Sequence, residues 1–227
     1  MSYAIGLTVP DGVLVVSDSR ASKLTSAGEY VYDGEGKIEV IAPNVVCVAA
    51  GILQLANAVI DDMRMQFASL DTLAAIRETQ SELMDTAWKV LTAHRAGLDP
   101  DALVIGVLTI GLRDGGPFLV ASLRHEIEGA MAKDVALDQP WGFWSIGAVD
   151  EKTQTKFRSA IRTINHSCQY DSACGPANAY LNLALTASSA AIRETEEQVP
   201  NLVGGPITAV IVRRDFGIHR LNVEEEL

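Results

Sequence analysis

The residue with the clearest chemical potential is Ser2, which follows the initiator methionine and precedes a strand-like segment. Methionine aminopeptidases remove Met1 readily when the next side chain is small, so we expect the mature chain to begin at Ser2. Ser2 would then carry a hydroxyl nucleophile and a free α-amine, whose ordinary pKa of about 7.7–8.0 suits a general base near neutral pH. A nucleophile beside a base is the arrangement that activates a hydroxyl.

Ser2 alone would more often belong to a frayed terminus, so its neighbours decide the interpretation. The segment Tyr3–Val9 predicts a strand that runs into a hairpin and would hold the start of the chain in place. A spaced set of residues then follows it: Asp18, Arg20, Lys37 and, after an apolar strand, Gly51. The combination favours a site built around the start of the chain.

The elements that must position these residues follow from the pattern of apolar and turn residues. Residues 21–36 are polar and contain glycine, which predicts a loop or an irregular hairpin. Gly51 opens a predicted helix that reaches about Phe67, and a second helix begins with Asp71 as its N-cap. The predicted strands of this first part are Tyr3–Val9, Gly12–Ser17, Lys37–Ile41 and Val45–Ala50.

The second part of the chain repeats the order of strands followed by helices. This order predicts an α+β fold, a four-layer αββα sandwich in which two antiparallel sheets pack face to face between helical layers. No linker or low-complexity tract interrupts it, so residues 1–227 are interpreted as one domain. The predicted strands are Ala102–Leu112, Pro117–Leu123, Ile127–Ala132, Gly142–Gly147, Pro206–Arg213 and Gly217–Leu221, and the helices are Glu151–Asn165 and Gly175–Glu197.

Composition and charge exclude several classes of function. The formal net charge is −11 and no cluster of Lys and Arg occurs, which argues against nucleic acid or an anionic membrane as a partner. No apolar run reaches the roughly 18 residues that span a bilayer, and the start lacks the pattern of a signal peptide. Three cysteines are an odd count and do not predict a disulfide framework. We therefore expect a cytoplasmic protein.

Metal and cofactor sites are not predicted. The four histidines are scattered, and His166, Cys168 and Cys174 lack a convincing ligand spacing. No glycine-rich phosphate motif occurs. The aromatic run Trp141–Trp144 is interpreted as packing in the core or at a subunit interface. The remaining histidines are His94, His125 and His219.

Several stretches of this sequence are similar to a known family. They are Ser2–Leu7, Asp11–Arg20, Gly36–Ile41 and Val48–Gly51, with weaker echoes at Ser145–Ala148 and Val203–Ile207. Through them the chain resembles the proteasome β-type family of N-terminal nucleophile hydrolases, which includes the bacterial protease HslV and the bacterial proteasome homologue Anbu. The Met-Ser-Tyr opening and the late Gly-Gly-Pro-Ile look closer to Anbu.

The resemblance implies roles for the central residues. Ser2 matches the nucleophile, and Lys37 matches a lysine whose positive charge keeps the α-amine neutral. Asp18 matches the carboxylate that pairs with this lysine and orients it. Gly51 matches the residue whose backbone N–H stabilises the developing oxyanion.

Further residues match supporting positions of the family. Arg20 matches a structural partner for carboxylates near the site, and Ser145, read in a turn before a helix, matches a serine that contacts the terminal amine. Ser22, Ala49 and Leu53 match positions that bind the peptide backbone or line the specificity pocket, which implies an apolar pocket of modest size.

The sequence departs from the family pattern at three places. Pro200 and Val203 stand where many relatives carry an aspartate and a serine near the nucleophile. The segment between Asp18 and Lys37 is a few residues longer than usual. Serine also replaces the commoner threonine, which removes the methyl group that restricts χ1 and predicts slower catalysis.

The resemblance therefore implies a peptidase that cleaves amide bonds through Ser2 in a homo-oligomeric ring or stacked assembly, with peptides or unfolded proteins as substrates. An ATPase partner follows only by analogy. Two alternatives stay open: a ring subunit that has lost activity, and a small-molecule amidohydrolase with the same N-terminal machinery. A retained Met1 favours the former, and a narrow site closed to peptides favours the latter.

Overall fold

A computed structural model gives the fold of the chain. It describes residues 3–9, 12–25, 28–34, 36–94, 103–113, 116–125, 134–137, 142–147, 151–170, 177–221 and 223. Within these residues the structure is α+β, with two large antiparallel sheets and four α-helices.

The first sheet has the strand order β10–β1–β2–β11–β12. Its strands are β1 (Tyr3–Val9), β2 (Gly12–Ser17), β10 (Phe143–Gly147), β11 (Thr208–Arg213) and β12 (Gly217–Leu221). The second sheet has the order β5–β6–β7–β8–β9. Its strands are β5 (Ile38–Ala42), β6 (Val45–Gly51), β7 (Val104–Arg113), β8 (Gly116–His125) and β9 (Val135–Leu137).

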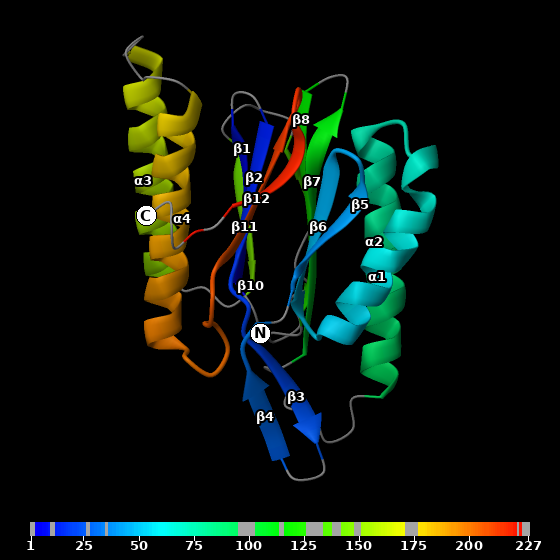
Figure 1. The fold of residues 1–227 in the computed structure, drawn as a ribbon. Coiled ribbons are helices and arrows are strands. Elements are labelled where there is room, and N and C mark those ends of the chain that lie inside the picture. The colour runs from blue at the N-terminus through cyan, green and yellow to red at the C-terminus, as the bar shows by residue number, and fades with distance from the viewer. Residues whose placement is uncertain are drawn as a thin grey trace.

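The helices cover the outer faces of the two sheets, which face each other in the middle of the molecule (Figure 1). Helices α1 (Leu53–Gln66) and α2 (Leu73–Ala93) lie on the second sheet, with the short 3-10 helix η1 (Phe67–Ser69) between them. Helices α3 (Glu151–Tyr170) and α4 (Ala177–Gln198) lie on the first sheet.

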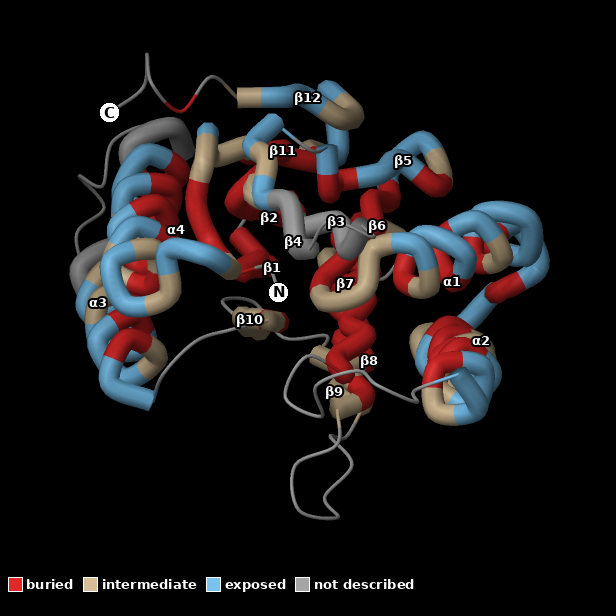
Figure 2. The backbone as a smooth tube through the Cα atoms, turned by 90° about the horizontal axis from the view of Figure 1, so that it is seen from below, coloured by how far each residue is buried: buried red, intermediate tan, exposed pale blue. Residues whose placement is uncertain are grey.

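Both faces of the central strands are apolar because each strand contributes to two separate cores. In β1, Tyr3, Ile5 and Leu7 pack under α3 and α4, whereas Ala4 packs between the sheets. Successive side chains of a strand point to opposite faces, so an unbroken apolar run suits a strand buried on both sides. Figure 2 shows these buried strands at the centre and exposed residues on the outer sides of the helices.

The segment 21–36, predicted as a loop or irregular hairpin, contains a regular hairpin. Strands β3 (Ala21–Thr25) and β4 (Gly28–Tyr32) pair with each other alone, in a two-stranded sheet. This hairpin projects beyond the two large sheets (Figure 1). It accounts for part of the segment between Asp18 and Lys37.

Several predicted boundaries were wrong. Thr72, not Asp71, is the N-cap of α2, because its side chain accepts a hydrogen bond from the N–H of Ala75 at 3.1 Å. Gly51 ends strand β6 and the following helix begins at Leu53, since the φ of +80° at Gly51 is not helical. The predicted strand Ile127–Ala132 lies outside the described residues.

The aromatic residues of β10 belong to the core, one of the two interpretations that their sequence left open. The ring of Phe143 meets that of Phe157 edge to face at 5.1 Å between centroids, which joins β10 to α3. Trp144 packs against the core between the sheets. Trp141 lies outside the described residues. None of the described helices combines the length and apolarity needed to cross a bilayer.

Candidate active site

Asp18 lies directly after β2 and is the centre of a buried hydrogen-bond network. Its Oδ1 atom accepts hydrogen bonds from the Nζ of Lys37 at 2.8 Å and from the backbone N–H of Tyr3 at 2.9 Å. Its Oδ2 atom accepts from the backbone N–H of Gly204 at 3.1 Å and that of Arg20 at 3.3 Å. This carboxylate therefore connects its own segment with three others, at Tyr3, Lys37 and Gly204.

Lys37 reaches Asp18 because it immediately precedes β5, the edge strand of the second sheet. The side chains of both residues are 0% exposed. Burial raises the pKa of the Asp18 carboxyl above its ordinary value, and the Lys37 ammonium and the N–H groups of Tyr3 and Gly204 act in the opposite direction. A buried lysine and a buried aspartate thus form an ion pair between the ends of two strands in different sheets.

Tyr3 connects this ion pair to the start of the chain. Its backbone oxygen accepts a hydrogen bond from the N–H of Asp18 at 3.2 Å, in addition to the bond from its own N–H to the carboxylate. Strand β1 is further fixed by its register, which pairs Tyr3 with Gly147 and Ala4 with Ser17. Ser2 itself lies outside the described residues. Its direct neighbour is held at Asp18 by two hydrogen bonds.

Gly204 belongs to this network, although no functional role was predicted for it from the sequence. Its carbonyl oxygen accepts hydrogen bonds from the N–H groups of Ser19 at 3.2 Å and Arg20 at 2.9 Å, while its own N–H binds Asp18. The φ of Gly204 is +151°, and a Cβ there would collide with the ends of Arg20 and Glu196. The glycine pair at 204–205 was the signal that could have identified this close approach of two segments.

Arg20 fixes the segment before Gly204 and the projecting hairpin. Its Nε atom lies 2.7 Å from Oδ1 of Asp33, and its NH1 donates to the backbone oxygens of Val203, at 3.3 Å, and Pro200. Glu196 lies 3.7 Å away. The hydrogen bond from Arg20 lowers the pKa of Asp33. Arg20 therefore binds carboxylates beside the site. It also binds the backbone at Pro200 and Val203, the two residues that depart from the family pattern.

Val203 and Pro200 contribute to this arrangement through their backbones. The side chain of Val203 is fully buried in the core beneath α3 and α4. The segment thus offers Asp18 a backbone N–H from Gly204 and offers Arg20 two carbonyl oxygens. The aspartate and serine of the family pattern are absent, yet the segment still contacts the buried ion pair.

Gly51 occupies a position that only glycine fits. Its φ is +80°, and a Cβ would collide with the backbone oxygen of Val104. Ala49, two residues earlier in β6, donates its N–H to the backbone oxygen of Lys37 at 3.1 Å, which brings this strand to the lysine. The side chain of Ala49 is buried in the core under α1, and Leu53 at the start of α1 is half-buried against the same core.

Ser145 does not lie in the predicted turn before a helix. It is part of strand β10, opposite Ile5 of β1, and α3 begins only at Glu151. The hydrogen bonds described here do not join it to Asp18 or Lys37. Ser22 lies on β3, where its backbone pairs with Val31. The structure therefore gathers Tyr3, Lys37 and Arg20 around Asp18. Ser145 and Ser22 lie on strands β10 and β3.

Within the described residues, no group of three or more His, Cys, Asp or Glu side chains is placed to hold a metal ion. Of the cysteines, Cys47 is a free, buried thiol. Its Sγ lies 3.0 Å from the Oγ1 of Thr109, in a polar cluster beneath α2 that is separate from Asp18. Comparisons with models of known protein families and with curated proteins found no match to this chain.

Proposed function

We propose that this chain is a proteasome-type amide hydrolase with the fold of the N-terminal nucleophile hydrolases. In this proposal Ser2, exposed by removal of Met1, cleaves peptide bonds within a cytoplasmic homo-oligomeric assembly. The supporting observation is the Asp18 carboxylate, which binds the Lys37 ammonium and the backbone N–H of Tyr3, the residue directly after Ser2.

The proposed chemistry uses the start of the chain as nucleophile and base. The Ser2 oxygen attacks the carbonyl carbon of the substrate amide, and the α-amine takes the hydroxyl proton, directly or through a water. The tetrahedral intermediate collapses to an acyl-ester, and the leaving amine takes up that proton. A water activated by the same amine then hydrolyses the ester and regenerates Ser2.

Lys37 supports this chemistry through its charge. A buried ammonium beside the start of the chain disfavours a second positive charge there, and so keeps the α-amine in its neutral, basic form. In this proposal Asp18 positions Lys37. Arg20 supports Asp18 indirectly, because its backbone N–H binds the backbone oxygen of Gly204, whose own N–H binds Asp18. The N–H of Gly51 is assigned to the oxyanion, and the backbone around Ala49 and Leu53 to the substrate.

The test compares the wild type with Ser2→Ala and Ser2→Thr, which all permit removal of Met1. Intact mass must first show that Met1 is absent, because a blocked amine cannot act as the base. We expect peptide hydrolysis and labelling by a peptide epoxyketone in the wild type and Ser2→Thr, and neither in Ser2→Ala. Full turnover by Ser2→Ala would refute the proposal.

One observation favours an inactive ring subunit as the second candidate. The valine at 203 removes a hydroxyl that relatives carry near the nucleophile, and its side chain is sealed in an apolar core. This candidate predicts an assembled protein that retains Met1 and does not react with the epoxyketone. Native mass spectrometry and intact mass together separate the two candidates.

A further inference from the structure

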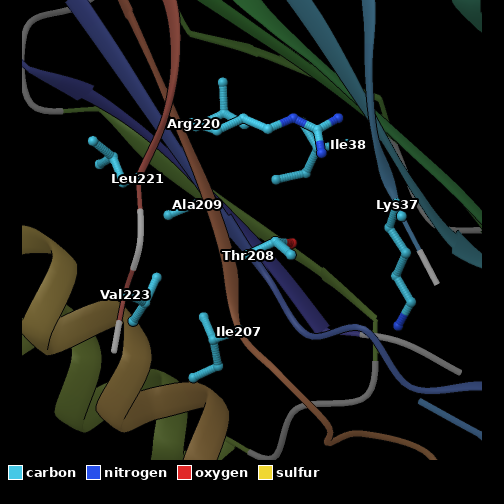
Figure 3. A pocket seen from close by; sticks show the side chains of 10 residues that line it. Lys37, Ile38, Ile207, Thr208, Ala209, Arg220, Leu221 and Val223 are labelled. Atoms are coloured by element: carbon cyan, nitrogen blue, oxygen red, sulfur yellow. The ribbon is translucent and has the colours of Figure 1, made fainter. Parts of the chain in front are cut away.

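A cavity of about 360 Å³ lies beside Lys37, at the side of the sandwich where β5 faces β11 and β12. Its lining begins at Gly36, crosses the first residues of β11 and ends at Val223 (Figure 3). Ligand pockets in proteins typically occupy about 300–1,000 Å³ and are mostly apolar with a few polar groups. The size of this cavity lies at the lower end of that range.

The walls of the cavity are aliphatic. Ile207, Leu221 and Val223 lie on one side, toward α4, and Ile38 lies on the opposite side (Figure 3). The three residues of the first wall also pack against the core beneath α3 and α4, which fixes their positions. None of the described residues that line the cavity is an aspartate or a glutamate. This part of the lining therefore suits a hydrocarbon body and carries no negative charge.

Arg220 supplies a positive charge at this cavity. It pairs with Val210 across strands β11 and β12, and Val210 faces the core between the sheets, so Arg220 projects from the same face. Figure 3 shows its guanidinium extending toward Ile38. The Lys37 ammonium is bound to Asp18, which leaves Arg220 as the cation of the cavity lining that can meet a ligand.

Within the part of the chain that the structure describes, Arg220 lacks the carboxylate partners that Arg20 and Arg124 have. Arg20 and Arg124 each lie within 4.0 Å of two carboxylates. For Arg220, the described residues provide no carboxylate at such a distance, and the residue is exposed. Among the described residues this guanidinium therefore has no counter-charge, and at an aliphatic cavity it is complementary to an anion with an apolar body.

We propose that this cavity binds an aliphatic carboxylate, with the carboxylate on Arg220 and the hydrocarbon between Ile207, Leu221 and Ile38. The planar guanidinium matches a carboxylate through two parallel hydrogen bonds. The carboxylate can come from a peptide that ends in an aliphatic residue or from a free aliphatic acid. This inference is independent of the proposed hydrolysis, because binding to the cavity requires neither Ser2 nor catalysis.

The cavity is also connected to the buried ion pair. The hydroxyl group of Thr208, which lines the cavity, donates a hydrogen bond to the backbone oxygen of Ser17 at 3.3 Å. Ser17 directly precedes Asp18. Lys37 itself is also one of the residues that line the cavity. A bound carboxylate would therefore perturb the NMR signals of Lys37 and Thr208 as well as those of Leu221.

The test measures binding to the full chain by calorimetry and by 1H–15N NMR. The probes are N-acetyl-leucine, its neutral analogue N-acetyl-leucinamide, and octanoate. We expect a Kd of about 1 mM or lower for at least one acid, and at least roughly tenfold weaker binding of the amide, as a charged hydrogen bond implies. Preference for N-acetyl-leucine over octanoate assigns the site to peptide ends, and the reverse preference assigns it to free acids.

Arg220→Gln and Arg220→Glu change an exposed side chain and leave the aliphatic walls intact. Both should abolish the preference for the acid, whereas Arg77→Gln, the same change on the exposed face of α2, should retain it. Ser2→Ala should bind as the wild type does, which separates this result from failure of the hydrolase proposal. Equal binding of acid and amide, absence of binding at millimolar concentrations, or an unaffected Arg220→Gln would overturn the inference. Arg220 would then act only as an inward-pointing charge that protects the edge of the sheet.

Discussion

The Nζ of Lys37 lies 2.8 Å from Oδ1 of Asp18, and neither side chain is exposed to solvent. Removing two charges from water is costly, and a buried ion pair offsets this cost only when the remaining polar atoms are satisfied. Asp18 meets this condition with the N–H groups of Tyr3, Arg20 and Gly204. We therefore infer that this ion pair serves mainly to position the start of β1, and not to increase the net stability of the fold.

Asp18→Asn should destabilise the fold strongly, because it leaves the Lys37 ammonium buried without a counter-charge. Breaking a buried pair from one side typically costs about 3–5 kcal/mol. Urea unfolding monitored by circular dichroism measures the change. The double variant Asp18→Asn/Lys37→Met should recover part of the loss, since it removes the unpaired charge. A single variant as stable as the wild type would contradict the buried pairing.

Gly204→Ala should detach the segment after Pro200 from Asp18. Its Cβ would displace Arg20 and Glu196, and the hydrogen bond from the Gly204 N–H to Asp18 would lengthen. We expect a loss of about 1–3 kcal/mol in the free energy of unfolding. The proposed function further predicts reduced peptide hydrolysis. Gly217→Ala is the control, because its φ is +71° but a Cβ there meets nothing within 4 Å. Equal effects of the two substitutions would exclude a special role for Gly204.

Much of the fold could be predicted because the strands bury both faces. Val13–Val16 is an unbroken run of aliphatic residues that alternate between two cores, and such a run has few alternatives to a central strand. Element boundaries that depend on a single hydrogen bond were harder to predict from the sequence. The choice of Thr72 over Asp71 as the N-cap is decided by local backbone geometry, since either side chain can accept the bond.

The contact between Lys37 and Asp18 was expected from the resemblance and not from residue type alone. Without the resemblance, the two residues would fit a carboxylate at a strand end and a lysine at the surface equally well. The role of Gly204 was harder to predict, because it acts through its backbone N–H and oxygen. The only sign of such a role in the sequence is that the residue is a glycine. Ser145 lies in the predicted strand Gly142–Gly147, and only its assignment to a turn before a helix was wrong, because the Ser-Ile-Gly run suits a strand end as well as a turn.

Gly51→Ala should be far more destabilising than Gly34→Ala. Both glycines have positive φ, +80° and +94°, but only at Gly51 would a Cβ meet backbone atoms, those of Val104 and Ile105. An alanine with positive φ costs about 1–2 kcal/mol of stability at either position. At Gly51 the collision of the Cβ with the backbone adds to this cost. Thermal unfolding of both variants gives the comparison. Similar losses in the two variants would show that β6 and β7 can separate at this point.

Cys47 should be unreactive in the folded protein. Burial raises the pKa of its thiol to about 12, while the hydrogen bond with Thr109 acts in the opposite direction. Because the thiolate is the reactive form, alkylation of Cys47 by iodoacetamide at pH 8 should be at least roughly a hundredfold slower than in urea-unfolded protein. Mass spectrometry of the peptide that contains Cys47 measures the two rates. Rapid labelling under native conditions would contradict its burial beneath α2.

The ion pair of Arg124 and Asp134 predicts a specific dependence of stability on pH. Arg124 has 5% of its side chain exposed and lies 2.9 Å from Oδ1 of Asp134, which joins β8 to the start of β9. Burial acts to raise the pKa of Asp134, but hydrogen bonds from Arg124, Ser81 and Ser122 outweigh it, and the pKa is lowered. Folding therefore favours the ionised carboxylate.

A lowered pKa contributes stability above the unfolded value of about 3.9, and this contribution is lost as the pH falls through the folded value. Asp134→Asn should thus cost about 1–3 kcal/mol at pH 7, and the difference from the wild type should shrink as the solution is acidified below the unfolded value. Urea unfolding across this range measures it, with Asp215→Asn at an exposed turn as a control that leaves stability at pH 7 unchanged. A difference that stays constant down to the acid transition would mean that Asp134 contributes through shape and not through its charge.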